Sequence, residues 1–155
     1  MQIHLLAVGQ RMPGWVEEGF ETYRKRLPKS SELILREIPQ GKRTAHADLE
    51  RIKNEEGQRM LDLIEPRDWV ICLEVSGKAL TTEGLALELE KWMRTGQRIM
   101  LLVGGPEGLS TAARARANQT LSLSTLTLPH PLVRIVVAEQ IYRAHSILTH
   151  HPYHR

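Results

Sequence analysis

The sequence predicts an α/β fold in which a mainly parallel sheet carries helices on both faces. Apolar runs rich in β-branched residues recur five times along the chain, and segments of helical period separate them. The chain has 155 residues, of which 41% are hydrophobic, so it can bury one sizeable core but is short for two. We therefore expect a single domain over residues 1–155.

Five strands are expected where the apolar runs lie. They cover residues 3–9 (IHLLAVG), 32–39 (ELILREIP), 69–77 (WVICLEVSG), 98–105 (RIMLLVGG) and 120–129 (TLSLSTLTLP). The third run contains Cys72, the only cysteine, which should behave there as a small buried hydrophobe. One cysteine excludes a disulfide within the chain and a zinc site built from cysteines.

Helices are expected between these strands, because apolar residues recur there at helical spacing. They cover residues 15–23, 49–64, 85–93, 111–117 and 131–149. Thr81 or Thr82 is expected to cap the third helix and Gly96 to end it, while Ser110 caps the fourth. The last helix begins with Pro131 at its first position, where a missing N–H costs nothing.

Composition and patterning exclude several classes of protein. No apolar run approaches the roughly 20 residues that a membrane helix needs. The N-terminus lacks the basic leader and the cleavage site of a signal peptide, so a cytoplasmic protein is expected. The net charge is only +3, but residues from 101 onward carry five Lys or Arg against two acids. That region would suit an anionic partner such as RNA, although charge alone favours an ordinary solvated face.

Three expected strands end in unusual sequences, at residues 75–77, 104–108 and 128–131. Since sites in open α/β sheets gather at the carboxyl ends of strands, these segments should lie together. In the glycine turn LVGGPEGLS, adjacent glycines allow a close approach of the backbone to a ligand. The patterns of dinucleotide and phosphate loops are absent from the sequence. The turn is thus either a tight connection or a binding loop, and Glu107 is either functional or a solvated turn residue.

The C-terminal third concentrates groups that can move protons or hold charge. His130 lies between two prolines, which hold it rigidly or simply start a helix. Glu139 and Arg143 are four residues apart, in the order that favours an ion pair. The end of the chain, THHPYHR, has no second cluster of ligands, so no metal site is expected. It is either a frayed tail or a segment that closes over a site or contacts RNA.

Three of these stretches together, LVGGPEGLS, SLSTLTLPHPLVRIVVAEQIYRA and HPYHR, closely resemble the ribosomal RNA large subunit methyltransferase H family. The resemblance covers essentially the whole chain, because AVGQRMPGWVEEGFETYRKRLP and EIPQGKR match it as well. It implies a SPOUT-type fold whose C-terminal part is threaded into a deep trefoil knot. Hydrophobic periodicity does not indicate a knot, and general rules of topology argue against one.

The resemblance also implies a function and a set of site residues. Members act as homodimers and use S-adenosylmethionine to methylate N3 of a pseudouridine in helix 69 of 23S rRNA, within the assembled 70S ribosome. The cofactor residues carried over by motif are Leu73, Gly104, Gly105, Ser124, Thr125, Leu126, Thr127, Leu128 and Pro129. The candidate RNA contacts are chosen by charge and position rather than by motif: Arg11, Lys42, Arg43, Tyr153 and Arg155, together with the basic run at residues 24–26. The alternative, that at least half of the basic residues are ordinary surface charges, stays open.

The chemistry of this transfer points to particular side chains. A methyl group on a sulfonium is already activated, so neither a metal nor a covalent nucleophile is needed. N3 of pseudouridine is a poor nucleophile until it loses its proton, and His130 and His154 are the candidate acceptors. Arg143 would stabilise negative charge on the base, while Glu139 would orient Arg143 or act as the base itself.

Two other functions stay open at this point. A SPOUT-like methyltransferase acting on another RNA, such as tRNA, would keep the cofactor site and change the substrate. A non-catalytic ribosome-binding factor would keep the fold alone, although the intact glycine turn and the HPYHR tail count against it.

Overall fold

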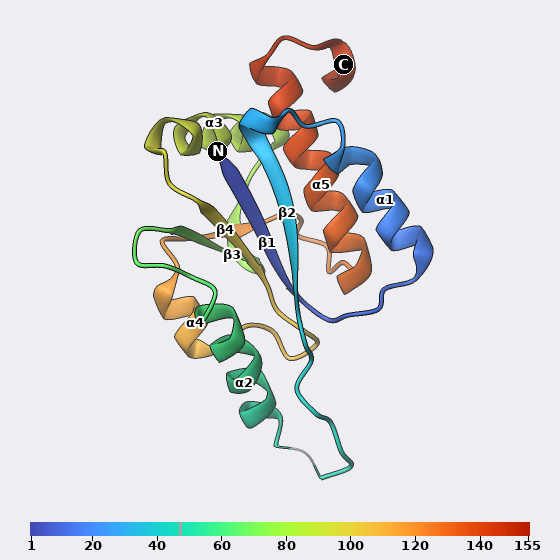
Figure 1. Cartoon of the computed structure of the whole chain (residues 1–155), viewed down its shortest axis with the longest axis vertical. Coiled ribbons are helices and arrows are strands. Elements are labelled where there is room, and N and C mark those ends of the chain that lie inside the picture. Colours follow the sequence, from blue (N-terminus) through green and yellow to red (C-terminus); the bar gives the residue numbers. More distant parts are fainter. Residues whose placement is uncertain (47) are drawn as a thin grey trace.

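The computed structural model describes residues 1–46 and 48–155 and contains one five-stranded sheet, in the order β2-β1-β4-β3-β5 (Figure 1). The strands are β1 (Gln2–Val8), β2 (Glu32–Ile38), β3 (Trp69–Ala79), β4 (Ile99–Val103) and β5 (Gln119–Ser122). All four pairs of neighbouring strands are parallel. The prediction of a mainly parallel α/β sheet is therefore confirmed.

The order of strands places a topological switch point between β1 and β4. From β1 the chain continues to the edge strand β2, whereas from β4 it passes β3 and continues to β5 at the opposite edge. The residues from Ile3 to Val8 and those of β4 are buried on both faces of the sheet, which explains why they are apolar apart from His4. Ligands bind at such switch points, outside the carboxyl ends of the strands.

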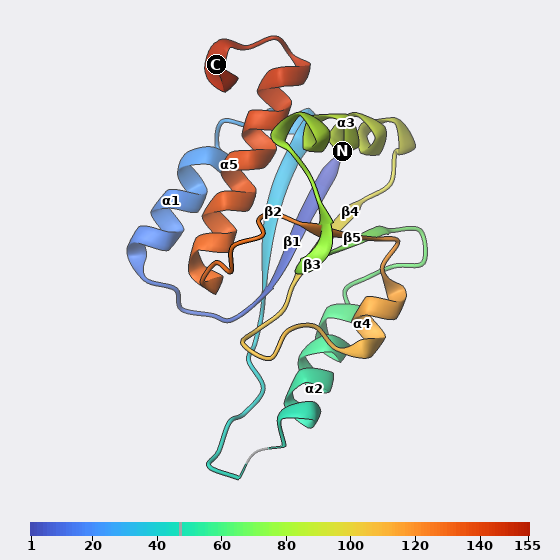
Figure 2. The same cartoon turned by 180° about the vertical axis from the view of Figure 1, so that it is seen from behind.

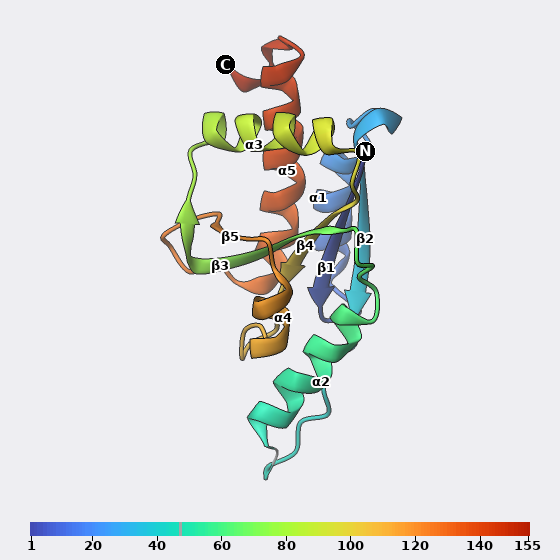
Figure 3. The same cartoon turned by 90° about the vertical axis from the view of Figure 1, so that its left-hand side faces the viewer.

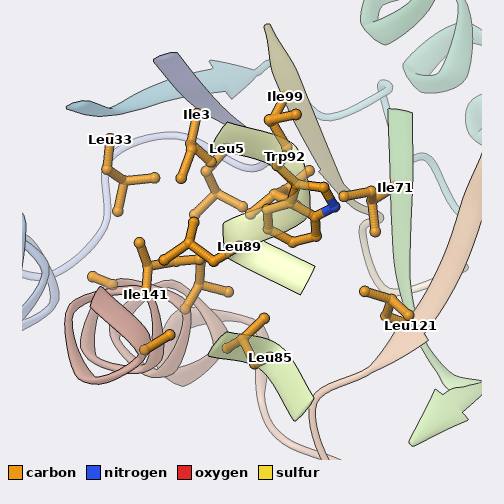
Figure 4. Close-up of a cluster of buried hydrophobic side chains, with 14 of the residues drawn as sticks. Ile3, Leu5, Leu33, Ile71, Leu85, Leu89, Trp92, Ile99, Leu121 and Ile141 are labelled. Atoms are coloured by element: carbon orange, nitrogen blue, oxygen red, sulfur yellow. The ribbon is translucent and has the colours of Figure 1, made fainter. Parts of the chain in front are cut away.

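Helices cover both faces of the sheet, as predicted (Figures 1 and 2). The first face carries α1 (Gly14–Arg24), α3 (Thr82–Thr95) and α5 (His130–Leu148), and Figure 3 shows α3 running across α5. The second face carries α2 (Leu49–Leu61) and α4 (Thr111–Arg116). The larger core cluster lies between the sheet and helices α1, α3 and α5, and it includes Leu89, Trp92 and Ile141 (Figure 4).

The second core cluster lies between the sheet and helices α2 and α4. It includes Met60, Cys72 and Ala113, so the single cysteine is a buried core residue. Burial raises the pKa of the Cys72 thiol to about 11, which keeps it protonated and unreactive at neutral pH. No helix in the described part of the chain is both long and apolar enough to cross a membrane.

All three expected helix caps are present, and one helix start was misplaced. Thr81 accepts a hydrogen bond of 2.9 Å from the amide of Gly84, and Ser110 accepts one of 3.1 Å from Ala113. Gly96 ends α3 with a left-handed φ of 70°. The start of α5 is His130 rather than Pro131, because Pro129 already occupies the N-cap position.

The expected strand over residues 120–129 is wrong beyond Ser122. The hydroxyl of Ser122 donates to the carbonyl of Ser124 at 2.8 Å, and the hydroxyl of Ser124 accepts from the amide of Leu126 at 2.9 Å. Such local bonds offer the backbone an alternative to the strand ladder. Residues 123–129 therefore form a loop that leads into α5. The knot that the resemblance implies stays a prediction.

Candidate functional site

A cavity of about 740 Å³ lies at the carboxyl edge of the sheet. It is lined by residues 73–76 of β3, by the turn that follows β4 and by the loop that follows β5, so the three segments singled out in the sequence do lie together. Seven of the nine residues that the resemblance assigns to the cofactor line it: Leu73, Gly104, Gly105, Ser124, Leu126, Thr127 and Leu128. The volume falls within the range of about 300–1,000 Å³ that is typical of ligand sites.

The glycine turn has a shape that only glycine permits at two positions. The amide of Gly108 donates to the carbonyl of Gly105 at 2.9 Å, which closes a turn around Pro106 and Glu107. Gly108 has a φ of 84°, in the left-handed region. A Cβ atom on Gly104 would lie only 2.5 Å from the carbonyl carbon of Gly108. The backbone is thus exposed to the cavity without side chains in the way.

Helix α2 supports this turn from beneath. Glu56 is 2% exposed, and its Oε2 accepts a hydrogen bond of 2.9 Å from the amide of Gly41. A Cβ atom on Gly105 would lie 3.3 Å from the other carboxylate oxygen of Glu56. Gly57 packs so closely that any side chain there would overlap the hydroxyl of Ser110, the cap of α4. Sequence reasoning missed this support, since Glu56 reads as one more charge on an exposed helix.

A basic loop is fastened to the same turn. Arg43 donates to Glu107 through two nitrogens, with a distance of 2.7 Å from Nη1 to Oε1. Glu107 is therefore an anchor for Arg43 rather than a freely solvated turn residue. Lys42, on the same loop, is exposed.

A second ion pair borders the cavity and was also missed in the sequence. Arg114 donates from Nε to Oε1 of Glu74 at 2.7 Å, and both residues line the cavity. Glu74 directly follows Leu73 at the point where the pairing of β3 with β5 shifts register. In the sequence, the signal for this ion pair was an acidic residue, Glu74, directly after the buried part of a strand.

His130 lines the cavity from the first turn of α5. Burial, followed by the nearby Arg134 cation, lowers the pKa of His130, while the backbone of Gly104 opposes the shift. Nε2 of His130 lies 3.5 Å from Nη2 of Arg134. The imidazole is therefore neutral at neutral pH and able to accept a proton.

Arg134 ties the start of α5 to the sheet. It is 2% exposed; Nη1 donates to Glu37 at 2.6 Å, and Nη2 donates to the carbonyl of Gly9 at 2.8 Å. These contacts join the carboxyl ends of β1 and β2 to the turn that carries His130. The sequence analysis assigned Arg134 no role. The signal for its burial was a lone cation within the apolar stretch PLVRIVVA.

A second cluster of candidate residues lies around Glu139. The predicted ion pair is confirmed, with Nε of Arg143 donating to Oε1 of Glu139 at 2.8 Å. The end of the chain is ordered as a short 3₁₀ helix, η2 (Pro152–His154), and the Tyr153 hydroxyl donates to the same oxygen at 3.0 Å. Burial, followed by Glu139, raises the pKa of Tyr153 to about 12, so it acts as a donor.

The two groups of candidate residues lie at opposite ends of α5. His130 begins the helix at the cavity, and Arg143 follows about 20 Å further along the axis, at about 1.5 Å per residue. The C-terminal segment lies at the far end of α5 (Figure 1). His154 is half-buried there, with Nδ1 3.5 Å from the hydroxyl of Ser146. One chain therefore does not bring Glu139, Arg143 or His154 to its own cavity.

Comparison with known proteins decides the family. A family model described as predicted SPOUT methyltransferase matches residues 1–154. The chain belongs to this family. Two relatives, from Methylococcus capsulatus and Hahella chejuensis, are each 54% identical over 155 residues, which is all of this chain and 100% and 99% of the relative. Both are named ribosomal RNA large subunit methyltransferase H, which confirms the resemblance seen in the sequence.

The cavity of this SPOUT methyltransferase fits a nucleoside-sized ligand. Leu73, Leu109 and Leu128 supply apolar walls, and the glycine turn presents bare backbone. A flat base is well held by such walls, and exposed main-chain groups can read its edges. Among residues 1–46 and 48–155, no group of three or more His, Cys, Asp or Glu is placed to hold a metal ion.

The remaining candidate RNA contacts of this SPOUT methyltransferase are exposed. Arg11 has a φ of 57°, a left-handed conformation that few residues other than glycine adopt. It lies in the loop after β1, next to Gly9, whose neighbours include His130 and Arg134. Arg155 is exposed at the end of the chain.

Proposed function

We propose that this SPOUT methyltransferase transfers a methyl group from S-adenosylmethionine to N3 of a pseudouridine in helix 69 of 23S rRNA, within the assembled 70S ribosome. The observation that carries the proposal is the cavity of about 740 Å³, which seven of the residues expected to bind the cofactor line. The names of the two relatives support the large-subunit rRNA as the substrate.

Leu73, the glycine turn and the loop over residues 124–128 would hold the cofactor. S-adenosylmethionine, when bound, supplies a methyl group that is already activated as part of a sulfonium. The residues of this chain then have to orient the acceptor, exclude water and take up one proton. Bare backbone at Gly104 and Gly105 allows donors and acceptors of the main chain to fix the adenine.

His130 is the proposed acceptor of the N3 proton. It borders the cavity, and its lowered pKa keeps the ring neutral at neutral pH, so it is free to accept a proton. Arg143 would neutralise charge that develops on the uracil oxygens, and Glu139 would orient it. His154 would provide a second group for proton transfer.

The separation of the two clusters along α5 supports a homodimer in which each tail completes the cavity of the partner. Two apolar residues that line the cavity are exposed in the single chain, Val75 by 51% and Leu126 by 72%, and Leu132 in the first turn of α5 is exposed by 38%. An apolar surface of this kind favours contact with a second copy. Arg143, Tyr153, His154 and Arg155 of one subunit would then face the cofactor of the other.

RNA would be held by charges around this composite site. Arg43 pairs with Glu107 of the glycine turn, and Lys42 precedes it on the same loop. Arg11 lies two residues after Gly9, which is close to His130, and Arg155 ends the tail. Such residues contact phosphates and fix the position of the substrate, whereas the shape of the assembled ribosome would supply specificity.

The test is transfer of labelled methyl groups from S-adenosylmethionine to ribosomes that lack the modification. Free 50S subunits, naked 23S rRNA and tRNA are assayed in parallel. We expect label only on assembled ribosomes, mapped to one pseudouridine of helix 69. Label on tRNA would show that tRNA, rather than 23S rRNA, is the substrate. No label on any RNA, with cofactor binding intact, would favour a ribosome-binding factor without catalysis.

A further inference from the structure

One cation faces three aromatic rings at the C-terminal end of α5. The guanidinium carbon of Arg26, just after α1, lies 5.4 Å from the ring centroid of Tyr23 in α1. It also lies 5.6 Å from the ring of Tyr142 in α5 and 5.8 Å from the ring of Tyr153 in the tail. These distances are within the range of about 6 Å over which a cation is attracted to a ring. Arg26 thus joins three separate elements.

Tyr153 makes the contacts that fasten the tail to α5. Its ring centroid lies 4.6 Å from that of Tyr142, at an interplanar angle of 57°. The guanidinium carbon of Arg143 lies 4.9 Å from the same ring, and the hydroxyl of Tyr153 donates to Glu139. The proposed catalytic residue Arg143 and the tail are therefore positioned by one cluster.

The backbone contributes less to the placement of the tail. His150 turns the chain with a φ of 57°, and the amide of His151 then donates to the carbonyl of Ser146 at 2.8 Å. The amide of Tyr153 then donates a hydrogen bond of 3.2 Å to Nδ1 of the His151 side chain. Residues beyond Pro152 are held to α5 mainly by side-chain contacts, most of which Tyr153 makes.

We infer that Arg26 is a positioning residue that holds the C-terminal tail against α1 and α5, so that Arg143 and His154 are presented as one unit. The inference deepens the proposed function and rests on it for the catalytic consequence. By sequence, Arg26 belongs to a basic run that suggested contact with phosphates. Its position over three rings gives it a different role within its own chain.

The geometry also explains why arginine suits this position. A planar guanidinium spreads its charge and stacks on aromatic faces, whereas the ammonium of lysine is a compact and strongly hydrated charge. Arg26 and Arg143 both approach the ring of Tyr153, whose negative face attracts a cation. Lysine would keep the charge and lose most of the stacking.

The experiment compares Arg26→Ala and Arg26→Lys with the unaltered protein. Hydrogen exchange of a peptide covering residues 149–155, measured by mass spectrometry, reports whether the tail is docked. We expect exchange about tenfold faster in Arg26→Ala and a smaller increase in Arg26→Lys, as the loss of two or three weak cation–ring contacts implies. Methyl transfer to ribosomes should show a lower kcat, with the affinity for S-adenosylhomocysteine unchanged.

Lys29→Ala is the matched control. It removes one positive charge from an exposed residue soon after α1, in the short helix η1 (Lys29–Ser31), and should leave exchange and kcat unchanged. Unchanged exchange in Arg26→Ala would overturn the inference. Faster exchange with an unchanged kcat would overturn the catalytic consequence. If the unaltered protein transfers no methyl group, the proposed function fails, and the exchange measurement still decides whether Arg26 holds the tail.

Discussion

The hydroxyl of Tyr153 donates to Oε1 of Glu139, the same oxygen that accepts from Nε of Arg143. The other carboxylate oxygen accepts a hydrogen bond of 2.7 Å from Gln140. A carboxylate offers about four sites for acceptance, and most of those on Glu139 are engaged. The contacts therefore favour Glu139 as the residue that orients Arg143, over its alternative role as the base.

Removal of the tail should separate catalysis from cofactor binding. Deletion of Pro152–Arg155 removes His154 and the Tyr153 contacts but leaves the cavity at the other end of α5 intact. We expect no measurable methyl transfer, with the affinity for S-adenosylhomocysteine within about twofold of the unaltered chain, a difference of about 0.4 kcal/mol. Single-turnover transfer and calorimetric titration measure the two quantities. Full activity of the truncated protein would refute the role of the tail.

The hydroxyl of Tyr153 can be tested alone with Tyr153→Phe. The ring and its contacts with Arg26 and Tyr142 are retained, and only the hydrogen bond to Glu139 is lost. We expect kcat to fall about fivefold, corresponding to about 1 kcal/mol for one hydrogen bond to a partly exposed carboxylate. Because the pKa of Tyr153 is raised to about 12, the hydroxyl is protonated throughout the working range. A steeper pH dependence in the variant would contradict its role as a simple donor.

The fall of kcat/KM at low pH, the acid limb of the pH profile, should reflect protonation of His130. Its pKa lies below the ordinary value of 6.5, because burial and Arg134 disfavour the charged ring. The neutral, proton-accepting form therefore persists as the pH falls, and kcat/KM should decline only below pH 6.5. His130→Asn should lower the rate at neutral pH by about 100-fold, the usual order for loss of a general base, and remove this limb. A limb that survives the substitution would assign the titration to His154 or another group.

Much of the fold could be read from the sequence because its signals were local. Buried strands give unbroken apolar runs, and the caps Thr81, Ser110 and Gly96 act within one turn of the helix ends they stabilise. The loop over residues 123–129 was misread as strand, because its alternation of Leu with Ser and Thr has the period of a strand. Instead, the hydroxyl of Ser122 donates to a backbone carbonyl, and the hydroxyl of Ser124 accepts from a backbone amide.

The parts of the site that could not be predicted depend on contacts between distant segments. Glu37 and Arg134 meet across almost a hundred positions, and Arg43 meets Glu107 across more than sixty. Nothing in the spacing of such residues relates them before the chain is folded. The resemblance identified the lining of the cavity, since motifs carry residues together with their roles. It did not indicate that His130 and Arg143 stand at opposite ends of one helix.

Close packing of the glycine turn predicts the effect of Gly104→Ala. The added methyl group would meet backbone atoms of Gly108, which cannot move aside as a flexible side chain could. We expect the affinity for S-adenosylhomocysteine to fall at least about tenfold, in line with a cost of about 1–3 kcal/mol for overpacking. Gly14→Ala, where a Cβ atom meets no atom of the described chain within 4 Å, is the control and should bind normally. Normal binding by Gly104→Ala would show that the turn does not form the cofactor site.

Arg134 provides the link between stability and catalysis. Arg134→Met keeps most of the volume but leaves the carboxylate of Glu37 and the carbonyl of Gly9 without their donor. Loss of one partner from a buried pair costs about 3–5 kcal/mol, and we expect about 2 kcal/mol because Glu37 is 35% exposed and partly solvated. Denaturant unfolding measures this loss of stability.

The same variant should move the acid limb of the pH profile. Arg134 is one cause of the lowered pKa of His130, so without this cation the pKa rises toward its ordinary value. Protonation then sets in at a higher pH, and the decline of kcat/KM begins nearer to neutral. Glu37→Gln, which breaks the charge pair but leaves Arg134 beside His130, should destabilise the fold without shifting the limb in this direction. If the acid limb of Arg134→Met does not shift, Arg134 anchors α5 but does not control the pKa of His130.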